Sequence, residues 1–94
     1  MTEFERAVEE TLRDLRPGEV VSYGFVAEQA GYPGRARAVG AFLASSAEAP
    51  NWWRVVGANG ALLAPRADLQ AQWLVAEGVN VVNGRCRAVN ARRP

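Results

Sequence analysis

The chain has 94 residues, 49% of them hydrophobic, and its eleven arginines against ten acidic residues give a formal net charge of +1. This length suits one small domain with a thin core, and so small a net charge favours no class of partner by itself. The absence of histidine excludes a histidine general base or metal ligand, and the single Cys86 excludes an internal disulfide and a cysteine-cluster zinc site.

The first predicted element is an amphipathic helix. Thr2 and Glu5 have the spacing of a capping box, which marks a helix N-terminus. Apolar residues then recur at helical intervals, at Phe4, Val8, Leu12 and Leu15. Pro17-Gly18 ends this helix, and Val20-Val21 reads as a short extended segment.

Two more helices are expected around a glycine-containing turn. Ser22 suits the N-cap of a short helix over residues 23–30, which Gly31 ends. A third helix is predicted over residues 35–46, after the turn at residues 32–34. Two helices joined in this way predict a helix-turn-helix.

The rest of the chain predicts two hairpins and a fourth helix. Residues 53–56 read as a strand that turns at residues 57–60 and pairs with residues 61–63, which suggests the wing of a winged helix. A helix over residues 66–77 is expected to bury Leu69, Trp73 and Leu74.

A second hairpin is predicted from residues 79–82 and 85–89 around Asn83-Gly84, with a frayed tail at residues 90–94. The fold class is therefore α+β and mostly helical. We expect a single winged helix-turn-helix domain over residues 1–94, with small β-hairpins.

The third predicted helix carries an unusual surface. Its outward positions are small except for Arg35 and Arg37, whereas helices that read the major groove carry long polar side chains. A smooth helix suits the narrower minor groove, with Arg37 as a single long probe. The alternative is that the small residues pack on another helix and the two arginines are only solvated.

Charge is unevenly distributed along the chain. Residues 1–34 carry three arginines and seven acidic residues, whereas residues 35–94 carry eight arginines and three acidic residues. The basic part can therefore meet DNA.

Two further signals have competing interpretations. Adjacent strand residues point to opposite faces, so one of Trp52 and Trp53 can be core while the other faces a cleft and stacks on a base. Both can equally be structural aromatics. Cys86 lies between Arg85 and Arg87, which can lower a thiol pKa, but it can also be an incidental small residue.

Three segments together carry a family resemblance: Gly18-Glu19-Val20-Val21-Ser22-Tyr23, Ala36-Arg37-Ala38-Val39-Gly40 and Trp52-Trp53-Arg54-Val55-Val56. Over residues 4–78 the chain resembles the C-terminal DNA-binding domain of O6-alkylguanine-DNA alkyltransferases. Those enzymes carry Pro-Cys-His-Arg-Val at the active site, where this chain reads Asn51-Trp52-Trp53-Arg54-Val55. Trp52 in place of the acceptor cysteine is the hallmark of the alkyltransferase-like proteins.

The resemblance implies a non-enzymatic DNA damage sensor. Such a protein binds duplex DNA through the minor groove, flips O6-alkylguanine into a Trp-lined pocket without alkyl transfer, and flags it for nucleotide excision repair. Tyr23 aligns with the tyrosine that crowds the phosphate, and Arg37 with the arginine that fills the vacated stack. The implied DNA-binding residues are Tyr23, Arg35, Ala36, Arg37, Ala38, Gly40 and Ala41. The implied lesion-pocket residues are Trp52, Trp53, Arg54, Val55, Val56 and Arg66.

The resemblance also sets expectations for partners. We expect lesion-containing duplex DNA and nucleotide excision repair proteins as partners, no membrane, no cofactor or metal, and a cytoplasmic monomer. The charged N-terminus is unlike a signal peptide.

The chain departs from the family pattern near the pocket. Trp53 stands where most relatives have a histidine, and Asn51 stands where they have a proline. Ser46 stands where relatives usually have an asparagine at the end of the recognition helix. These changes bear on lesion preference more than on DNA binding. Two alternatives stay open: a sequence-specific winged-helix transcriptional regulator or general DNA-binding protein, and a thiol enzyme that uses Cys86.

Overall fold

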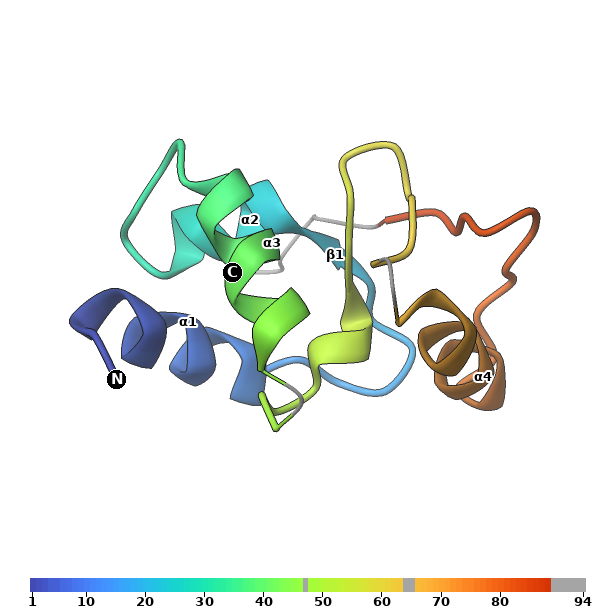
Figure 1. Ribbon diagram of the computed structural model, residues 1–94. Coiled ribbons are helices and arrows are strands. Elements are labelled where there is room, and N and C mark those ends of the chain that lie inside the picture. Colours follow the sequence, from blue (N-terminus) through green and yellow to red (C-terminus); the bar gives the residue numbers. More distant parts are fainter. Residues whose placement is uncertain (47, 64–65, 89–94) are drawn as a thin grey trace.

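The described residues form four α-helices, one 3-10 turn and a two-stranded parallel sheet, in a computed structural model that describes residues 1–46, 48–63 and 66–88 (Figure 1). In chain order the elements are α1 (Glu3–Arg13), β1 (Val21–Ser22), α2 (Tyr23–Gln29), α3 (Ala36–Ser45), the 3-10 turn η1 (Trp52–Arg54), β2 (Val55–Val56) and α4 (Ala67–Ala76). This arrangement confirms the α+β, mostly helical class. The predicted tail at residues 90–94 lies outside the described residues.

Helix α1 begins where the sequence predicts. The Thr2 hydroxyl accepts a hydrogen bond from the Glu5 backbone N–H at 3.0 Å, and the Glu5 carboxylate accepts one from the Thr2 N–H at 3.1 Å. The helix ends at Arg13, before the predicted stop at Pro17-Gly18. Leu15, although outside the helix, remains buried against the core.

The predicted helix-turn-helix is confirmed as α2 and α3. The Ser22 hydroxyl accepts a hydrogen bond from the Phe25 backbone N–H at 3.1 Å and so caps α2. The turn between the helices begins at Gly31, whose φ of +92° is a conformation that glycine adopts without strain. Val39 and Leu43 are the buried residues of α3.

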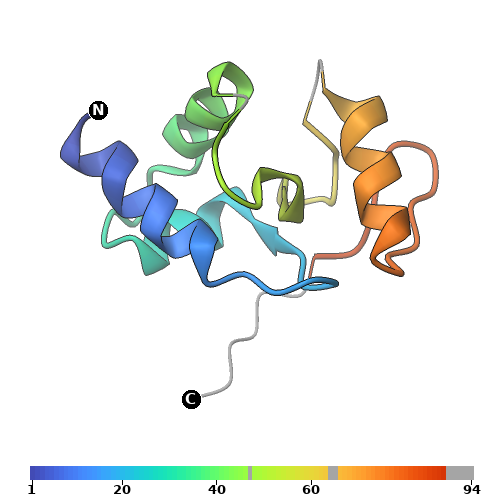
Figure 2. The same ribbon diagram turned by 90° about the horizontal axis from the view of Figure 1, so that it is seen from below.

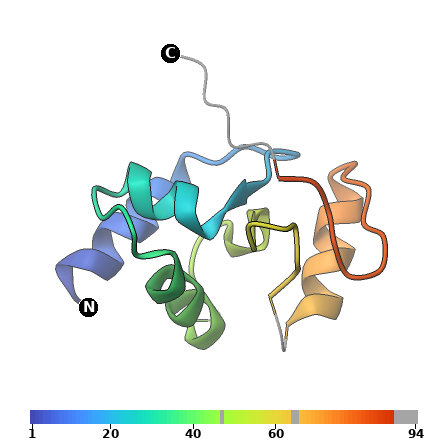
Figure 3. The ribbon, with the colours of Figure 1, turned by 90° about the horizontal axis from the view of Figure 1, so that it is seen from above.

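The sheet lies between two groups of helices. Helices α1, α2 and α3 gather on one side, and α4 lies on the other (Figures 2 and 3). Val55 belongs to the larger core cluster, with residues of α1, α2 and α3, while its neighbour Val56 packs with Leu74 of α4. This division follows from the alternation of side chains along a strand, and it leaves both valines of β2 fully buried.

The predicted pairing of the first hairpin is wrong. Residues 52–54 form the 3-10 turn η1 rather than the start of a strand, and β2 pairs with β1, with Val21 opposite Val55. Ala61 pairs instead with Arg85 in an isolated antiparallel bridge. An exposed hairpin wing would leave one face of β2 in water, whereas the central position buries both valines.

The turn of the second predicted hairpin forms as expected, whereas residue 89 at the end of its predicted second strand lies outside the described residues. Asn83 and Gly84 have φ of +54° and +73°, the positive values that a tight two-residue hairpin turn of the I′ type requires. Val82 and Arg85 flank the turn in a single antiparallel bridge.

Helix α4 buries one of the three predicted residues, Leu74, and the prediction is wrong for the other two. Leu69 and Trp73 are 40% and 39% exposed, whereas Gln70 and Leu74 are fully buried. The Gln70 amide donates hydrogen bonds to the Val55 carbonyl at 2.8 Å and the Trp53 carbonyl at 3.1 Å, and its oxygen accepts one from the Leu63 N–H at 2.7 Å. These bonds remove the cost of burying a polar amide, so Gln70 rather than Leu69 faces the core.

Candidate nucleic-acid interface

The predicted small-residue surface of helix α3 is partly exposed and partly packed against α2, where Gly40 lies near the Tyr23 ring and Ala36 near Gly24. Arg35, which stands at its N-cap, and Arg37 and Ala41 are exposed, while Ala36, Ala38 and Gly40 are half-buried. One helix therefore carries six of the seven predicted DNA-binding residues. Their contacts with DNA stay a prediction.

Tyr23, the seventh of these residues, lies beside α3. It is the first residue of α2, and a Cβ built on Gly40 would stand 3.6 Å from the Tyr23 ring. This is an ordinary van der Waals distance, so the Tyr23 ring packs close to the backbone of α3 at Gly40. Burial raises the pKa of the Tyr23 hydroxyl above its usual value of 10.0, which extends the pH range over which the hydroxyl stays protonated.

Trp52 lies in the core under an arginine. Its side chain is 1% exposed, and the Arg66 guanidinium carbon stands 3.8 Å from the centre of its ring. The same guanidinium donates hydrogen bonds to the Leu43 carbonyl at 2.6 Å and the Ser46 carbonyl at 3.3 Å. Arg66 thus joins the C-terminal end of α3 to Trp52, two parts of the predicted site that are far apart in sequence.

Trp53 lies on the wall of a cavity next to α4. Its ring is perpendicular to that of Trp73, with centroids 4.7 Å apart, and also packs edge-on against Trp52. A cavity of about 380 Å³ is lined by Trp53, Trp73, Ala76 and Glu77. One tryptophan is therefore core and its neighbour borders a cavity, as one interpretation of the sequence expects, but the backbone between them is a 3-10 turn rather than a strand.

Arg54 is held in a partly buried ion pair. Its side chain is 8% exposed and meets the Glu77 carboxylate through two contacts, Nη2 to Oε2 at 2.6 Å and Nε to Oε1 at 3.1 Å. Its Nη1 donates to the Leu15 carbonyl at 3.0 Å. The guanidinium therefore stabilises the base of the tryptophan cluster, with little surface left to meet a ligand.

Glu77 is the centre of this polar network. Its carboxylate also accepts hydrogen bonds from the Gly18 backbone N–H and the Trp53 indole N–H, each at 2.9 Å. Burial alone would raise the pKa of Glu77, but the hydrogen bonds from Arg54, Gly18 and Trp53, together with the Arg54 charge, lower this pKa to about 2. Sequence reasoning missed Glu77, because a glutamate 23 residues after its partner has no spacing that marks the pair.

The remaining predicted residues are buried. Val55 and Val56 are fully enclosed in β2, so they shape the site from within the core, and their part in a lesion pocket stays a prediction. Cys86 is buried as well, and burial raises the pKa of its thiol above the usual 9.0. This is opposite to the lowering that two neighbouring arginines suggest. In residues 1–46, 48–63 and 66–88, no group of three His, Cys, Asp or Glu side chains is placed to hold a metal ion.

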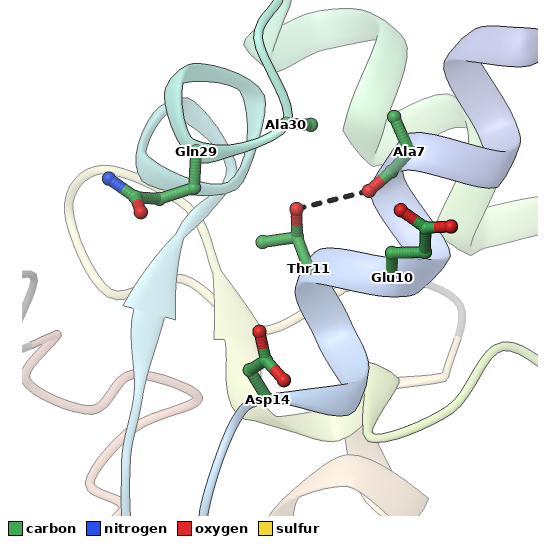
Figure 4. Close-up of a pocket in the computed structure, with 6 residues that line it drawn as sticks. All are labelled: Ala7, Glu10, Thr11, Asp14, Gln29 and Ala30. Carbon is green, nitrogen blue, oxygen red and sulfur yellow. Dashed lines mark hydrogen bonds between the residues drawn. The ribbon is translucent and has the colours of Figure 1, made fainter.

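A second, polar hollow lies between α1 and α2 (Figure 4). Its volume is about 240 Å³, and its lining consists of Ala7, Glu10, Thr11, Asp14, Gln29 and Ala30. The Thr11 hydroxyl donates to the Ala7 carbonyl at 3.0 Å, as Figure 4 shows. The two carboxylates of Glu10 and Asp14 make this hollow unfavourable for an anion such as phosphate. Among the described residues, no helix is long and apolar enough to cross a membrane.

Helices α2 and α3 form a helix-turn-helix, and α3 packs on the buried Trp52 of η1. The molecule is therefore a small, mostly helical domain of the helix-turn-helix class. The family model for the 6-O-methylguanine DNA methyltransferase DNA-binding domain matches residues 3–79. The chain belongs to this family.

Individual relatives and solved structures agree with the family match. The chain is 44% identical over 78 residues to a methylated-DNA–protein-cysteine methyltransferase of Shigella flexneri, covering 79% of this chain but only 45% of that relative. It is 36% identical over 85 residues to a DNA base-flipping protein of Vibrio parahaemolyticus, covering 86% and 85% of the two chains. The crystal structure of S. pombe Atl1 in complex with damaged DNA containing O6-carboxymethylguanine has the same fold, with a TM-score of 0.82, 24% identity and coverage of 100% and 98%.

Proposed function

We propose that this protein recognises O6-alkylguanine in duplex DNA and leaves the alkyl group in place. The observation that carries the proposal is Trp52, which stands where the family's enzymes have their acceptor cysteine and is buried under Arg66. A relative that covers most of the chain is named a DNA base-flipping protein, and a protein of the same fold was crystallised with damaged DNA. Both support recognition of damaged DNA by base flipping.

Helix α3 suits the approach to the minor groove. Its exposed Ala41 and half-buried Ala38 and Gly40 have small side chains, so the helix surface is nearly flat there. Arg37 is a long, exposed side chain on this surface. An arginine can fill the gap that a flipped nucleotide leaves, because its planar guanidinium both stacks and donates hydrogen bonds. Minor-groove entry with an inserted side chain also bends the duplex.

The flipped guanine needs a planar partner, which Trp52 supplies. The Arg66 guanidinium occupies one face of this ring, so a base that stacks on that face displaces Arg66 from it. Arg66 also donates hydrogen bonds to carbonyls at the end of α3. Entry of a base that moves Arg66 would therefore alter these bonds to the helix that holds the DNA.

Alkyl transfer is not expected from this site. Transfer requires a thiolate, and the chain's one cysteine is buried, with a raised pKa, in a different core cluster from Trp52. The chain has no histidine to activate a thiol. We therefore expect the protein to recognise the alkylated base without removing its alkyl group.

A competition binding assay tests this function. A labelled duplex with one O6-methylguanine is competed with the same duplex carrying guanine, and the protein is then weighed by mass spectrometry. We expect preference for the lesion and an unchanged protein mass. Equal competition by both duplexes would instead support the general DNA-binding alternative, a preference for one undamaged sequence would support a regulator, and an added methyl group would support a transferase.

We also propose that the bound protein marks the lesion for nucleotide excision repair, as a monomer in the cytoplasm. A sensor that leaves the alkyl group in place depends on another activity to excise it. The proposal is tested by incision of a lesion-containing plasmid in a repair-competent extract. Incision should rise when the protein is added, and no change would reject the link.

Tyr23 gives a prediction about flipping. Tyr23→Ala should weaken lesion binding roughly tenfold or more, because the ring that crowds the backbone is lost. Tyr23→Phe should keep most of the affinity, because the ring and its packing on Gly40 remain. Fluorescence anisotropy with the lesion duplex measures both variants. Equal loss in the two would show that the hydroxyl acts rather than the ring.

A further inference from the structure

We propose that Asn51 is a positioning residue that sets the orientation of Trp52 and thereby the lesion preference of this protein. The proposal rests on the proposed function of the Trp52 site. Asn51 is the residue immediately before η1, and its backbone has φ of +55° and ψ of +25°. This left-handed conformation fixes the direction in which the chain enters the turn that carries Trp52.

The side chain of Asn51 ties this turn to α1. Its amide nitrogen donates hydrogen bonds to the Leu12 carbonyl at 2.9 Å and the Leu15 carbonyl at 3.4 Å. Leu12 lies in the last turn of α1 and Leu15 two residues beyond its end, a stretch where backbone carbonyls can accept hydrogen bonds from outside the helix. The amide therefore fastens the entrance of the turn to a rigid helix 36 to 39 residues earlier in the chain.

The backbone of Asn51 fastens the turn from the other side. Its carbonyl accepts a hydrogen bond from the Arg54 N–H at 3.0 Å, which closes the 3-10 turn around Trp52. The Arg54 guanidinium also donates to the Leu15 carbonyl. Trp52 is thus held between two residues that both donate a hydrogen bond to the Leu15 carbonyl, just after α1.

Few residue types meet both requirements at this position. Asparagine tolerates a positive φ better than most residues, and it alone adds an amide donor of this length. Glycine keeps the backbone but lacks the donor, and aspartate would turn a carboxylate toward two carbonyl oxygens. Proline, whose φ is fixed near −65°, cannot adopt the Asn51 backbone. The Trp52 turn therefore depends on a contact that a proline at this position cannot make.

The chain offers a matched control for the substitution. Asn83 has φ of +54°, nearly the same as Asn51, and lies exposed in the turn at residues 82–85. Asn51→Gly and Asn83→Gly therefore make the same chemical change at nearly the same positive φ. Only the first removes an amide that contacts α1.

Two measurements test the proposal. Affinities for the O6-methylguanine duplex and the matching guanine duplex are compared for both variants and for Asn51→Asp. We expect Asn51→Gly to lower lesion affinity by roughly three- to tenfold, the effect of lost buried hydrogen bonds, with guanine-duplex affinity unchanged because α3 is untouched. Asn51→Asp should lose at least as much, and Asn83→Gly should match the wild type. The second measurement is the NMR resonance of the Trp52 indole N–H, which should shift in Asn51→Gly alone.

The outcomes separate this proposal from the proposed function. A wild-type protein without lesion preference overturns the proposed function, and the Trp52 resonance then still decides the role of Asn51. An unshifted resonance in Asn51→Gly overturns the positioning role. A parallel loss of affinity for both duplexes with a lower unfolding midpoint also overturns it, because Asn51 would then only hold the fold together.

Discussion

Replacement of Arg37 by alanine is expected to weaken binding to an O6-methylguanine duplex about a hundredfold, with no loss of folding stability. Arg37 is exposed near the N-terminus of α3. Flipping a nucleotide costs a few kcal/mol of stacking and pairing, and without a side chain to fill the gap this cost appears directly in the affinity. The expected loss corresponds to about 2.7 kcal/mol.

A charge-matched control separates insertion from general attraction to DNA. Arg6 is exposed on α1, so Arg6→Ala removes the same charge away from α3. Fluorescence anisotropy should show a small change for Arg6→Ala, and thermal unfolding should be alike for both variants and the wild type. Equal losses for the two would reduce Arg37 to a contributor of net charge, and would contradict the flipping mechanism.

The second large effect is expected from Glu77→Gln, which should lower the free energy of unfolding at neutral pH by roughly 3 kcal/mol. The substitution removes the counter-charge of Arg54, whose side chain is 8% exposed. It also turns an NH₂ group toward donors from Gly18, Trp53 and Arg54. Urea unfolding measures the difference.

Glu9→Gln is the matched control. Glu9 pairs with Arg13 at 3.4 Å on the surface of α1, where the Arg13 side chain is 59% exposed. A surface pair of this kind contributes on the order of 0.5 kcal/mol or less. If both substitutions cost the same small amount, the Arg54–Glu77 pair does not stabilise the site.

The same pair predicts a pH dependence. The pKa of Glu77 is about 2 in the folded protein, against an ordinary value of 4.5. A lowered folded pKa means that the contribution is fully present above about pH 4.5 and is lost as the pH falls through about 2. The stability difference between wild type and Glu77→Gln should therefore shrink between pH 5 and pH 2. A difference that stays constant over this range would contradict the assignment.

A set of polar contacts lies beneath the tryptophans of η1, at the base of the proposed pocket. The tryptophans of η1 rest on an ion pair from α4, on the buried amide of Gln70 and on the amide of Asn51. These polar contacts orient the aromatic rings, because ring packing alone has little directional preference among tilted and edge-on geometries. A site that discriminates a small alkyl group needs such orientation.

The sequence by itself determined the elements that local hydrogen bonds define. The capping box at Thr2 and Glu5, the cap at Ser22 and the Asn83-Gly84 turn each involve residues within four positions of one another, and each is present in the structure. The resemblance also aligns Trp52 with the family's acceptor cysteine, and this alignment stays a prediction.

Only the tertiary structure decided what surrounds Trp52. The parallel pairing of β1 with β2, the burial of Gln70 in place of Leu69, and the Arg54–Glu77 pair join segments between 7 and 34 residues apart. No local pattern marks such contacts, since the same glutamine or glutamate suits a solvated helix face equally well. They form because packing of the whole chain closes these groups off from water, and a buried polar group must then find its partner inside the protein.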